Sequence, residues 1–400
     1  MKVLLVGSGG REHALAWALA RSSDLGELHA APGNPGIAEL ASCHPVRADD
    51  LGSLVPLATE LRPDLVVVGP EAPLVAGLAD ELRHRGLAVF GPSEDAARIE
   101  GSKGFAKDVM EAAGVPTAQT LAAARAPCVL KADGLAAGKG VWVCRTQAEL
   151  DAGLRAADAL GQPFHVEELL EGDEVSLFAL CDGAIALPLP AAQDYKRIGD
   201  GDEGPNTGGM GSYSPVRRLS TDEVDELVEL VCAPILSELA RRRTPFVGAL
   251  FAGVMLTEDG PRVLEYNCRF GDPETQSLLP RLDGDVLEAL AACGAGSLAG
   301  IRLGSSPSAA VTVVLAGRDY PERGDSGTPI TGVADAEAAG ALVFHAGTAL
   351  HDGELVTNGG RILAVTALGD SIDGARSAAY DAASRIHFDG VRFRSDIARG

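Results

Sequence analysis

Aromatic side chains are scarce in this chain, at 4% of 400 residues, so its cores must consist mainly of leucine, valine, isoleucine and alanine. Basic residues are also in the minority, with 34 lysines and arginines against 56 aspartates and glutamates and a formal net charge of -22. A protein that coats nucleic acid or an anionic membrane needs a broad basic face, so this balance disfavours both functions. It still allows a local basic pocket for a small anion.

Paired cysteines and long apolar runs are missing as well, and the first residues do not predict a leader segment. None of the seven cysteines forms a CxxC pair and their number is odd, which disfavours a zinc ribbon or disulfide framework and favours a reducing cytoplasm. No apolar run reaches the about 18 residues of a membrane-spanning helix. Met1–Gly7 is typical of a strand entering a glycine loop, not of a signal peptide. We therefore expect a cytoplasmic protein without a membrane span.

The order of strand-like and helix-like segments predicts an α/β chain. Strands alternate with helices in residues 1–100, which predicts a doubly wound parallel sheet. Residues 128–168 read as a small α+β unit, and 309–400 as a last unit of strands and one helix. Between them we expect a loop at Gly199–Gly211 and a single helix at Thr221–Arg241, capped by Thr221.

The first motif is the glycine loop Gly7–Gly10, which lies between a strand and a helix. Such a loop lets backbone N–H groups approach a phosphate, although a merely tight turn would have the same pattern. A dinucleotide fingerprint is disfavoured, because its third glycine is replaced by Glu12 and no acidic residue ends the next strand. Asn34 and the loop before Glu71 are expected at the same carboxyl edge of the sheet, where open α/β sheets bind ligands.

Two further glycine-rich stretches suggest ligand loops. The stretch from Lys131 to Val141 lacks the spacing of a P-loop and is followed by a strand, so it reads as a glycine loop across a hairpin. Its N–H groups and Lys139 could wrap a polyphosphate, or the loop could be a plain turn with an exposed lysine. The cluster Asp194–Arg197 leads into the loop with Thr207, which reads as a substrate-closing element or as a plain surface loop.

Carboxylates and an amide at two strand ends suggest nucleotide and metal binding. Glu167 and its acidic neighbours could accept hydrogen bonds from adenine and ribose, although solvated glutamates explain them equally. Glu265 and Asn267 are two apart on a predicted strand, so their side chains leave the same face. Their oxygens suit a Mg²⁺ ion that bridges phosphates, although a polar strand edge would have the same pattern. Arg269, next on that face, could hold a carboxylate or a transferring phosphoryl group. Cys268 has no histidine near it in sequence, which disfavours a nucleophile.

Together these motifs resemble the ATP-grasp superfamily and, within it, the glycinamide ribonucleotide synthetase family. The resemblance runs from GSGGREHA at Gly7 to NGGR at Asn358, and NCRFGDPETQ from Asn267 is its most specific part. It implies a Rossmann-like (pre-ATP-grasp) substrate domain at 1–100, an ATP-grasp domain at 101–306 with a lid at about 122–188, and a C-terminal α+β domain at 309–400. Unlike many ATP-grasp enzymes, the strand Phe251–Met255 carries no metal-binding carboxylate.

The resemblance also implies site residues. It implies ATP contacts at Lys103, Lys131, Gly138, Lys139, Gly140, Glu167, Glu168, Leu170 and Glu174. It implies substrate contacts at Gly9, Gly10, Asn34, Glu71, Thr207, Gly208 and Gly209, catalytic roles for Asp194, Lys196 and Arg269, and metal binding by Glu265 and Asn267.

The implied activity is an ATP-dependent ligase that joins glycine to 5-phosphoribosylamine in purine biosynthesis, with Mg²⁺ or Mn²⁺, as a monomer or weak oligomer. Activating a carboxylate by phosphorylation needs positioning and charge neutralisation, which fits a chain without a Ser/His/Asp or Cys/His set. Another ATP-grasp ligase or carboxylase acting on a different acid would share these motifs. A nucleotide-binding regulator is disfavoured, because the metal pair and the lysines are retained.

Overall fold

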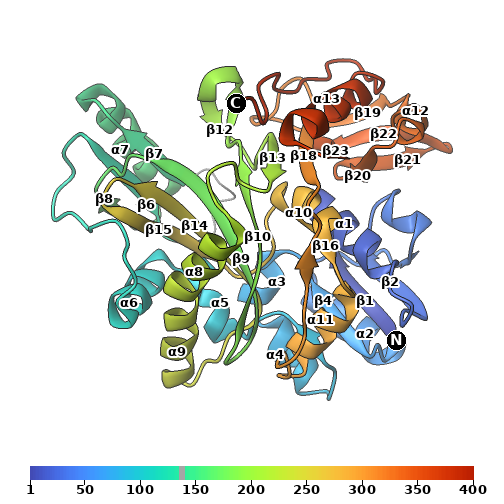
Figure 1. Cartoon of the computed structure of the whole chain (residues 1–400), viewed down its shortest axis with the longest axis horizontal. Coiled ribbons are helices and arrows are strands. Elements are labelled where there is room, and N and C mark those ends of the chain that lie inside the picture. The colour runs from blue at the N-terminus through green and yellow to red at the C-terminus, as the bar shows by residue number, and fades with distance from the viewer. Residues whose placement is uncertain (135–139) are drawn as a thin grey trace.

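The computed structural model describes residues 1–134 and 140–400, and begins with a five-stranded parallel sheet in the order β3-β2-β1-β4-β5 (Figure 1). Its central strands β1 (Lys2–Gly7) and β4 (Leu65–Val68) are buried apolar runs, as parallel strands with helices on both faces must be. The doubly wound sheet predicted for residues 1–100 is confirmed. Its other elements are α1 (Gly10–Leu19), β2 (Glu27–Pro32), β3 (Ser42–Cys43), α2 (Leu51–Leu61), α3 (Glu71–Val75), α4 (Leu78–Arg83), β5 (Val89–Phe90) and α5 (Glu94–Gly101).

The second unit is built on a large antiparallel sheet in the order β15-β14-β9-β10-β13-β18-β23-β20. Its first five strands and their helices are β9 (Asp173–Asp182), β10 (Ala186–Asp194), β13 (Gly211–Ser214), β14 (Val247–Thr257), β15 (Gly260–Asn267), α6 (Lys103–Ala113), α8 (Thr221–Val231), α9 (Ala233–Arg241), α10 (Glu274–Leu278) and α11 (Val286–Gly294). β13 pairs with β18 (Ala309–Ala316), so the sheet runs on into the C-terminal unit across the predicted boundary at 306–309. The pair β16 (Leu282–Asp283) and β17 (Gly304–Ser305) lies beside this junction.

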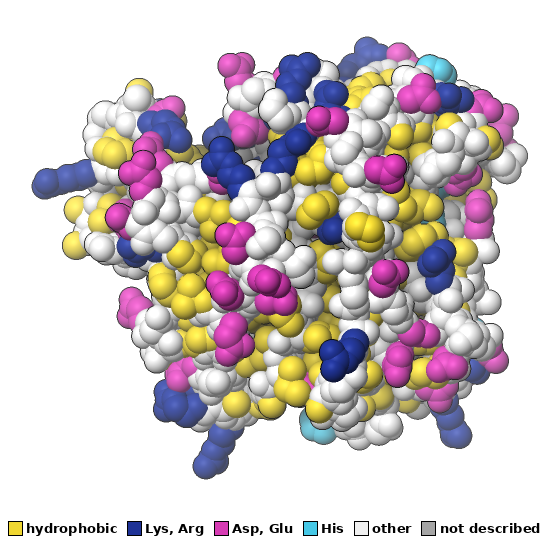
Figure 2. Space-filling model, in the orientation of Figure 1, with side chains coloured by type: hydrophobic (Ala, Val, Ile, Leu, Met, Phe, Trp, Pro, Cys, Tyr) yellow, Lys and Arg dark blue, Asp and Glu magenta, His cyan; other side chains and the backbone are white. Residues whose placement is uncertain are grey.

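A small sheet, β7-β6-β8, forms the lid with α7 (Gln147–Leu160). Its strands are β6 (Cys128–Ala132), β7 (Val141–Cys144) and β8 (Phe164–Glu167). The lid lies at the upper left of Figure 1, and in Figure 2 it forms a lobe set off from the rest of the upper surface. The predicted lid limit at about residue 188 lies beyond this small sheet, because β9 and β10 join the large one.

The C-terminal unit completes the large sheet and adds a second one. β23 (Arg361–Gly369) and β20 (Leu342–His345) continue the large sheet, and α13 (Ile372–Ala383) packs on β23 and β18. The second sheet, in the order β19-β22-β21, is formed by β19 (Asp325–Pro329), β21 (Thr348–His351) and β22 (Glu354–Gly359), and α12 (Val333–Ala338) packs against α13.

Two local expectations are wrong. The helix expected at Thr221–Arg241 is two helices that meet at Cys232, where Pro234 in the first turn of α9 lacks the N–H needed to continue α8, and its cap is the Ser220 side chain. The loop expected at Gly199–Gly211 contains a short hairpin of β11 (Arg197–Gly199) and β12 (Glu203–Asn206).

The units share cores rather than packing as separate bodies. One apolar cluster joins Leu4 and Val66 of the N-terminal sheet to Leu177 and Leu250 of the large sheet. Acidic side chains are scattered over the face in Figure 2, as expected if the net charge of -22 is carried by the solvated exterior. Within the described residues, every helix is too short or too polar to cross a membrane.

Candidate functional site

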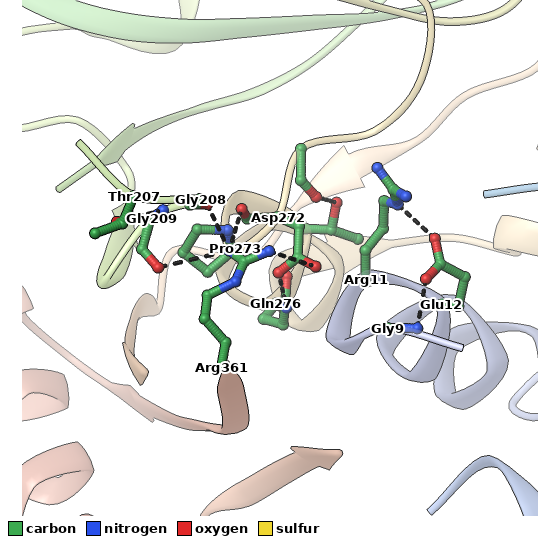
Figure 3. A network of polar contacts seen from close by, with 12 residues as sticks. Gly9, Arg11, Glu12, Thr207, Gly208, Gly209, Asp272, Pro273, Gln276 and Arg361 are labelled. Carbon is green, nitrogen blue, oxygen red and sulfur yellow. Dashed lines mark hydrogen bonds and ion pairs between the residues drawn. The ribbon is translucent and has the colours of Figure 1, made fainter. Parts of the chain in front are cut away.

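The glycine loop after β1 is filled by the side chain of Glu12. The Glu12 carboxylate accepts a hydrogen bond from the Gly9 backbone N–H at 2.7 Å and pairs with Arg11 (Figure 3). A Cβ at Gly7 or Gly69 would lie 2.4 or 2.3 Å from Glu12 atoms, so both glycines make room for this side chain. Glu12 stands at the position of the third glycine of a dinucleotide fingerprint and brings negative charge to the loop, which disfavours a pyrophosphate there.

Asn34 ties the N-terminal unit to the C-terminal unit. Its amide Nδ2 donates to the carbonyl oxygens of Ser8 at 2.9 Å and His345 at 2.8 Å, while its Oδ1 accepts from the Ile37 N–H at 2.9 Å. The side chain predicted to contact substrate therefore already holds the glycine loop against the C-terminal unit. A substrate that binds Asn34 would do so at the edge between these units.

A buried histidine pair lies beside Asn34. The His345 backbone N–H donates to Nδ1 of His13 at 2.7 Å, and Nδ1 of His345 lies 3.1 Å from the Thr348 hydroxyl. Burial lowers the pKa of His13 to about 3, with His345 as a second cause, and burial lowers the pKa of His345 to about 4. Both rings are therefore neutral at physiological pH.

Arg269 is the hub of the charged cluster that joins the N-terminal unit to the ATP-grasp sheet. Its guanidinium lies 3.3 Å from the Glu71 carboxylate and 3.1 Å from that of Glu100, and it donates to Oδ1 of Asn267 at 3.2 Å. Burial alone would lower the pKa of Arg269, but the carboxylates of Glu100 and Glu71 raise it above its ordinary value. The structure thus brings together three predicted residues, Glu71, Arg269 and Asn267, and adds Glu100.

Glu265 and Asn267 lie two apart on β15, as predicted, and have the oxygen donors that Mg²⁺ prefers. Lys103 lies 2.9 Å from the Glu265 carboxylate and is the main cause of its lowered pKa, so this carboxylate is ionised. Nδ2 of Asn267 is buried and has no hydrogen-bond partner among the residues that the structure describes. Gly253 lies opposite Glu265 on the neighbouring strand β14. Among residues 1–134 and 140–400, no group of three acidic, cysteine or histidine side chains is placed to hold a metal ion. The oxygen donors of this pair are of the type that fits a Mg²⁺ ion, whose remaining ligands would come from phosphates and water.

Two lysines share the buried carboxylate of Glu167. Lys131 lies 2.7 Å and Lys107 3.0 Å from its two oxygens, and Lys131 also donates to the Leu264 carbonyl at 2.8 Å. These three charged side chains line a small cavity together with Lys103 and other residues. Burial lowers the pKa of Lys107, against the opposing effect of Glu167. The arrangement places two ammonium groups around one carboxylate and keeps a net positive charge for an incoming phosphate.

Three other residues predicted to contact ATP, Glu168, Leu170 and Gly140, lie at or near the ends of the lid strands. The Glu168 carboxylate accepts from the Gln119 N–H at 2.8 Å, and the Gly140 carbonyl accepts from the Ala132 N–H at 2.7 Å. Leu170 is half-buried just after the end of β8. The predicted contacts Gly138 and Lys139 lie outside the described residues.

A second charged cluster lies at the end of β10. Lys196 pairs with Glu174, which joins a lysine predicted to be catalytic to a carboxylate predicted to contact ATP. Burial would lower the pKa of Lys196, but Glu174 and Asp194 raise it well above its ordinary value. Burial raises the pKa of Asp194 well above its ordinary value, and burial also raises that of Glu274, whose carboxylate accepts from the Ser176 hydroxyl at 3.2 Å. The cluster therefore combines a lysine with carboxyl groups whose pKa values burial raises.

The predicted substrate loop at Thr207–Gly209 is fixed by internal bonds. The Thr207 hydroxyl donates to the Lys196 carbonyl and accepts from the Gly209 N–H, both at 2.9 Å. The Gly208 N–H donates to the Tyr320 hydroxyl at 2.9 Å, and the Gly208 carbonyl accepts from Arg361. These backbone groups are already paired within the protein.

Sequence reasoning missed four charged residues of these clusters: Glu100, Lys107, Glu274 and Arg361. Lys107 stands one turn after Lys103 on α6, so helical spacing could have found it. Glu100 and Glu274 lie within the quoted stretches EGSK and NCRFGDPE. Arg361 is the last residue of the quoted stretch NGGR, but its partners come from other units, so no local pattern indicates what it contacts.

Comparison with known proteins identifies the family. Family models of phosphoribosylglycinamide synthetase match the N domain at residues 1–100, the ATP-grasp (A) domain at 101–275 and the C domain at 310–400. The phosphoribosylamine–glycine ligase of Streptomyces coelicolor is 51% identical, over 100% of this chain and 99% of its own length. The chain belongs to the phosphoribosylglycinamide synthetase family. The Mesorhizobium japonicum ligase is 48% identical over 99% of this chain and 97% of its own length. The crystal structure of the Thermotoga maritima ligase superposes with a TM-score of 0.85 at 34% identity, covering 99% of this chain and 100% of that one.

The phosphoribosylglycinamide synthetase models also cover the clusters described above. The glycine loop at Gly9 falls in the N match, the Glu265 cluster in the ATP-grasp match and Arg361 in the C match. The three-unit fold implied by the sequence motifs is thus confirmed as the architecture of this family.

Proposed function

We propose that this chain is a phosphoribosylamine–glycine ligase of purine biosynthesis. It would use ATP to join the carboxyl group of glycine to the amine of 5-phospho-D-ribosylamine, giving glycinamide ribonucleotide, ADP and phosphate. The observation that carries this proposal is 51% identity to a curated ligase over the entire chain. The charged clusters described above supply the chemistry that such a reaction requires.

The reaction needs an activated glycine carboxylate, because oxide is not a usable leaving group at neutral pH. A carboxylate oxygen of glycine attacks the γ-phosphorus of ATP, and the bond to the β-phosphate oxygen breaks to release ADP. The phosphoribosylamine nitrogen then attacks the carbonyl carbon of glycyl phosphate, phosphate leaves, and the nitrogen gives up a proton. Both steps depend on positioning and charge neutralisation rather than on a covalent protein nucleophile.

ATP would bind between the lid and the large sheet. Lys103 and Lys131 line the small cavity, and their ammonium groups would neutralise the phosphates. Because the Glu167 side chain is engaged by two lysines, we propose that adenine contacts its backbone and that of Leu170. Glu174, and the predicted contacts Glu168 and Gly140, would lie along the nucleotide.

Glu265 and Asn267 would hold a Mg²⁺ ion, with Mn²⁺ as a substitute. The bound ion would neutralise charge on the phosphates and orient the transferring group. Lys103 keeps the Glu265 carboxylate ionised, and its ammonium group must move away from or share this carboxylate when the ion binds. The Arg269 bond to Oδ1 of Asn267 must loosen or share this oxygen when the ion binds.

The two substrates would meet between the N-terminal loop and the cluster at the end of β10. Gly9, Gly10, Asn34 and Glu71 would receive phosphoribosylamine, with the loop Thr207–Gly209 completing the wall. Asp194, Lys196 and Arg269 would surround glycine and the amine. Burial raises the pKa of the Asp194 carboxyl group above its ordinary value, which would favour a role in moving the proton that the amine gives up.

We also propose that the chain acts in the cytoplasm as a monomer or weak oligomer. All seven cysteines are free thiols and six of them are buried, which suits a reducing compartment.

The deciding experiment measures ADP release with phosphoribosylamine generated in the reaction mixture, because an aminal is labile. ADP release should depend on both glycine and phosphoribosylamine, and bicarbonate in place of glycine should not support it. Oxygen-18 in the glycine carboxylate should appear in the released phosphate. Turnover without glycine, or label retained wholly in the amide, would overturn the proposal.

A further inference from the structure

Arg361 reaches from the C-terminal unit into the ATP-grasp unit. It is the first residue of β23, and its side chain is 20% exposed. Its Nη1 donates to the carbonyl oxygens of Gly208 and Asp272, the latter at 2.7 Å, and its Nη2 lies 3.2 Å from the Asp272 carboxylate (Figure 3). One guanidinium therefore bridges two segments that are far apart in sequence.

The backbone at Gly208 and Gly209 packs closely against Arg361 and Pro273. A Cβ at Gly209 would lie 2.3 Å from the Pro273 ring, and one at Gly208 would lie 3.0 Å from the Arg361 guanidinium carbon. The Tyr320 hydroxyl accepts from the Gly208 N–H at 2.9 Å, so the C-terminal unit binds both the backbone N–H and the backbone carbonyl of Gly208.

Asp272 connects this clamp to the N-terminal glycine loop. Its Oδ1 accepts from Nε2 of Gln276 at 2.8 Å, and that amide would lie 2.6 Å from a Cβ at Gly10. Its Oδ2 would lie 3.5 Å from a Cβ at Gly9. The carboxylate neutralised by Arg361 thus borders the loop at which we place the phosphate of phosphoribosylamine.

We propose that Arg361 is a positioning residue for phosphoribosylamine, an inference that rests on the proposed function. It does not touch the substrate. It fixes the loop at Gly208 and cancels the charge of Asp272, which would otherwise repel a phosphate beside Gly9 and Gly10. Arg11 does the same for the other carboxylate of this loop, that of Glu12. The C-terminal unit is then part of the phosphoribosylamine site, although it carries none of the residues assigned to ATP.

The test is a set of steady-state measurements on the full-length chain with each substrate varied in turn. Arg361→Ala should raise the KM for phosphoribosylamine about tenfold or more, with the KM values for ATP and glycine changing less than about threefold. Tyr320→Phe should act in the same direction by a smaller factor. Asp272→Asn introduced into Arg361→Ala should bring the KM for phosphoribosylamine part of the way back, because it removes the uncancelled charge. Arg385→Ala is the matched control, since the Arg385 side chain pairs with Asp381, four residues away on the exposed surface and outside the proposed site.

Three outcomes would overturn the inference. An unchanged KM for phosphoribosylamine in Arg361→Ala would do so, as would equal rises in all three KM values with a lower unfolding midpoint, which would indicate a merely structural role. An added Asp272→Asn that worsens binding would refute the charge argument. If the wild-type chain fails to ligate glycine, the proposed function itself fails and the inference fails with it, whereas normal wild-type ligation isolates the role of Arg361.

Discussion

Acidification should weaken the junction of the N-terminal and C-terminal units through His13 and His345. Burial lowers their pKa values from 6.5 to about 3 and about 4, so the unfolded chain binds more protons than the native chain between about pH 6.5 and pH 4. The free energy of unfolding must therefore fall as the pH falls through this window. The bond from the His345 N–H to Nδ1 of His13 gives the structural reason, because a protonated Nδ1 could not accept it.

The size of this effect follows from the two pKa values. With a pKa of 6.5 in the unfolded chain, lowering the pH from about 7.5 to about 5 costs about 2 kcal/mol for each histidine that stays neutral in the native chain. The pair together accounts for about 4 kcal/mol, a large share of the roughly 5–15 kcal/mol that stabilises a typical domain.

The assay is urea unfolding followed by circular dichroism at both pH values. Because carboxylates also titrate on acidification, the informative quantity is the change in unfolding free energy with pH in each variant. His13→Gln should reduce that change by about 2 kcal/mol relative to the wild type. His351→Gln is the control, since this side chain is 77% exposed and keeps its hydration in the folded chain. The same pH dependence in the wild type and His13→Gln would refute the reasoning.

Three further predictions concern the site and its frame. Glu265→Gln should lower kcat about 100-fold and raise the Mg²⁺ concentration needed for half-maximal ADP release, because the ion loses a negatively charged ligand. An unchanged Mg²⁺ dependence would contradict the assignment of Glu265 as a metal ligand. Lys107→Met should lower the free energy of unfolding, measured in urea, by about 3 kcal/mol, because the buried Glu167 carboxylate loses one of its two lysines. Lys2→Met is the control and should be nearly neutral, because Lys2 pairs with Glu27 at the surface. Gly36→Ala places a Cβ 2.2 Å from Cε1 of His13 and should lower the free energy of unfolding by about 1–3 kcal/mol. Gly52→Ala should leave it unchanged, because the nearest atom to that Cβ is 3.4 Å away.

Much of the fold could be predicted from local pattern. Buried apolar strands alternating with helices predicted the parallel sheet of residues 1–100, since parallel strands need cover on both faces. The limits of the lid and the break at Cys232 were not predictable in this way. Which sheet β9 and β10 join depends on pairing with the distant β14, and a single proline decided where one helix ended and the next began.

The sequence by itself determined the fold class, the family resemblance and the placement of Glu265 and Asn267 on one face of a strand, because period-two geometry is local. Only the tertiary structure decided which charges meet. It paired Glu174 with Lys196, enclosed Glu167 between two lysines and joined His13 to His345, whose sequence separation is 332 residues. Such contacts depend on strand register and on how the units pack, and a motif read along the chain carries no information on either.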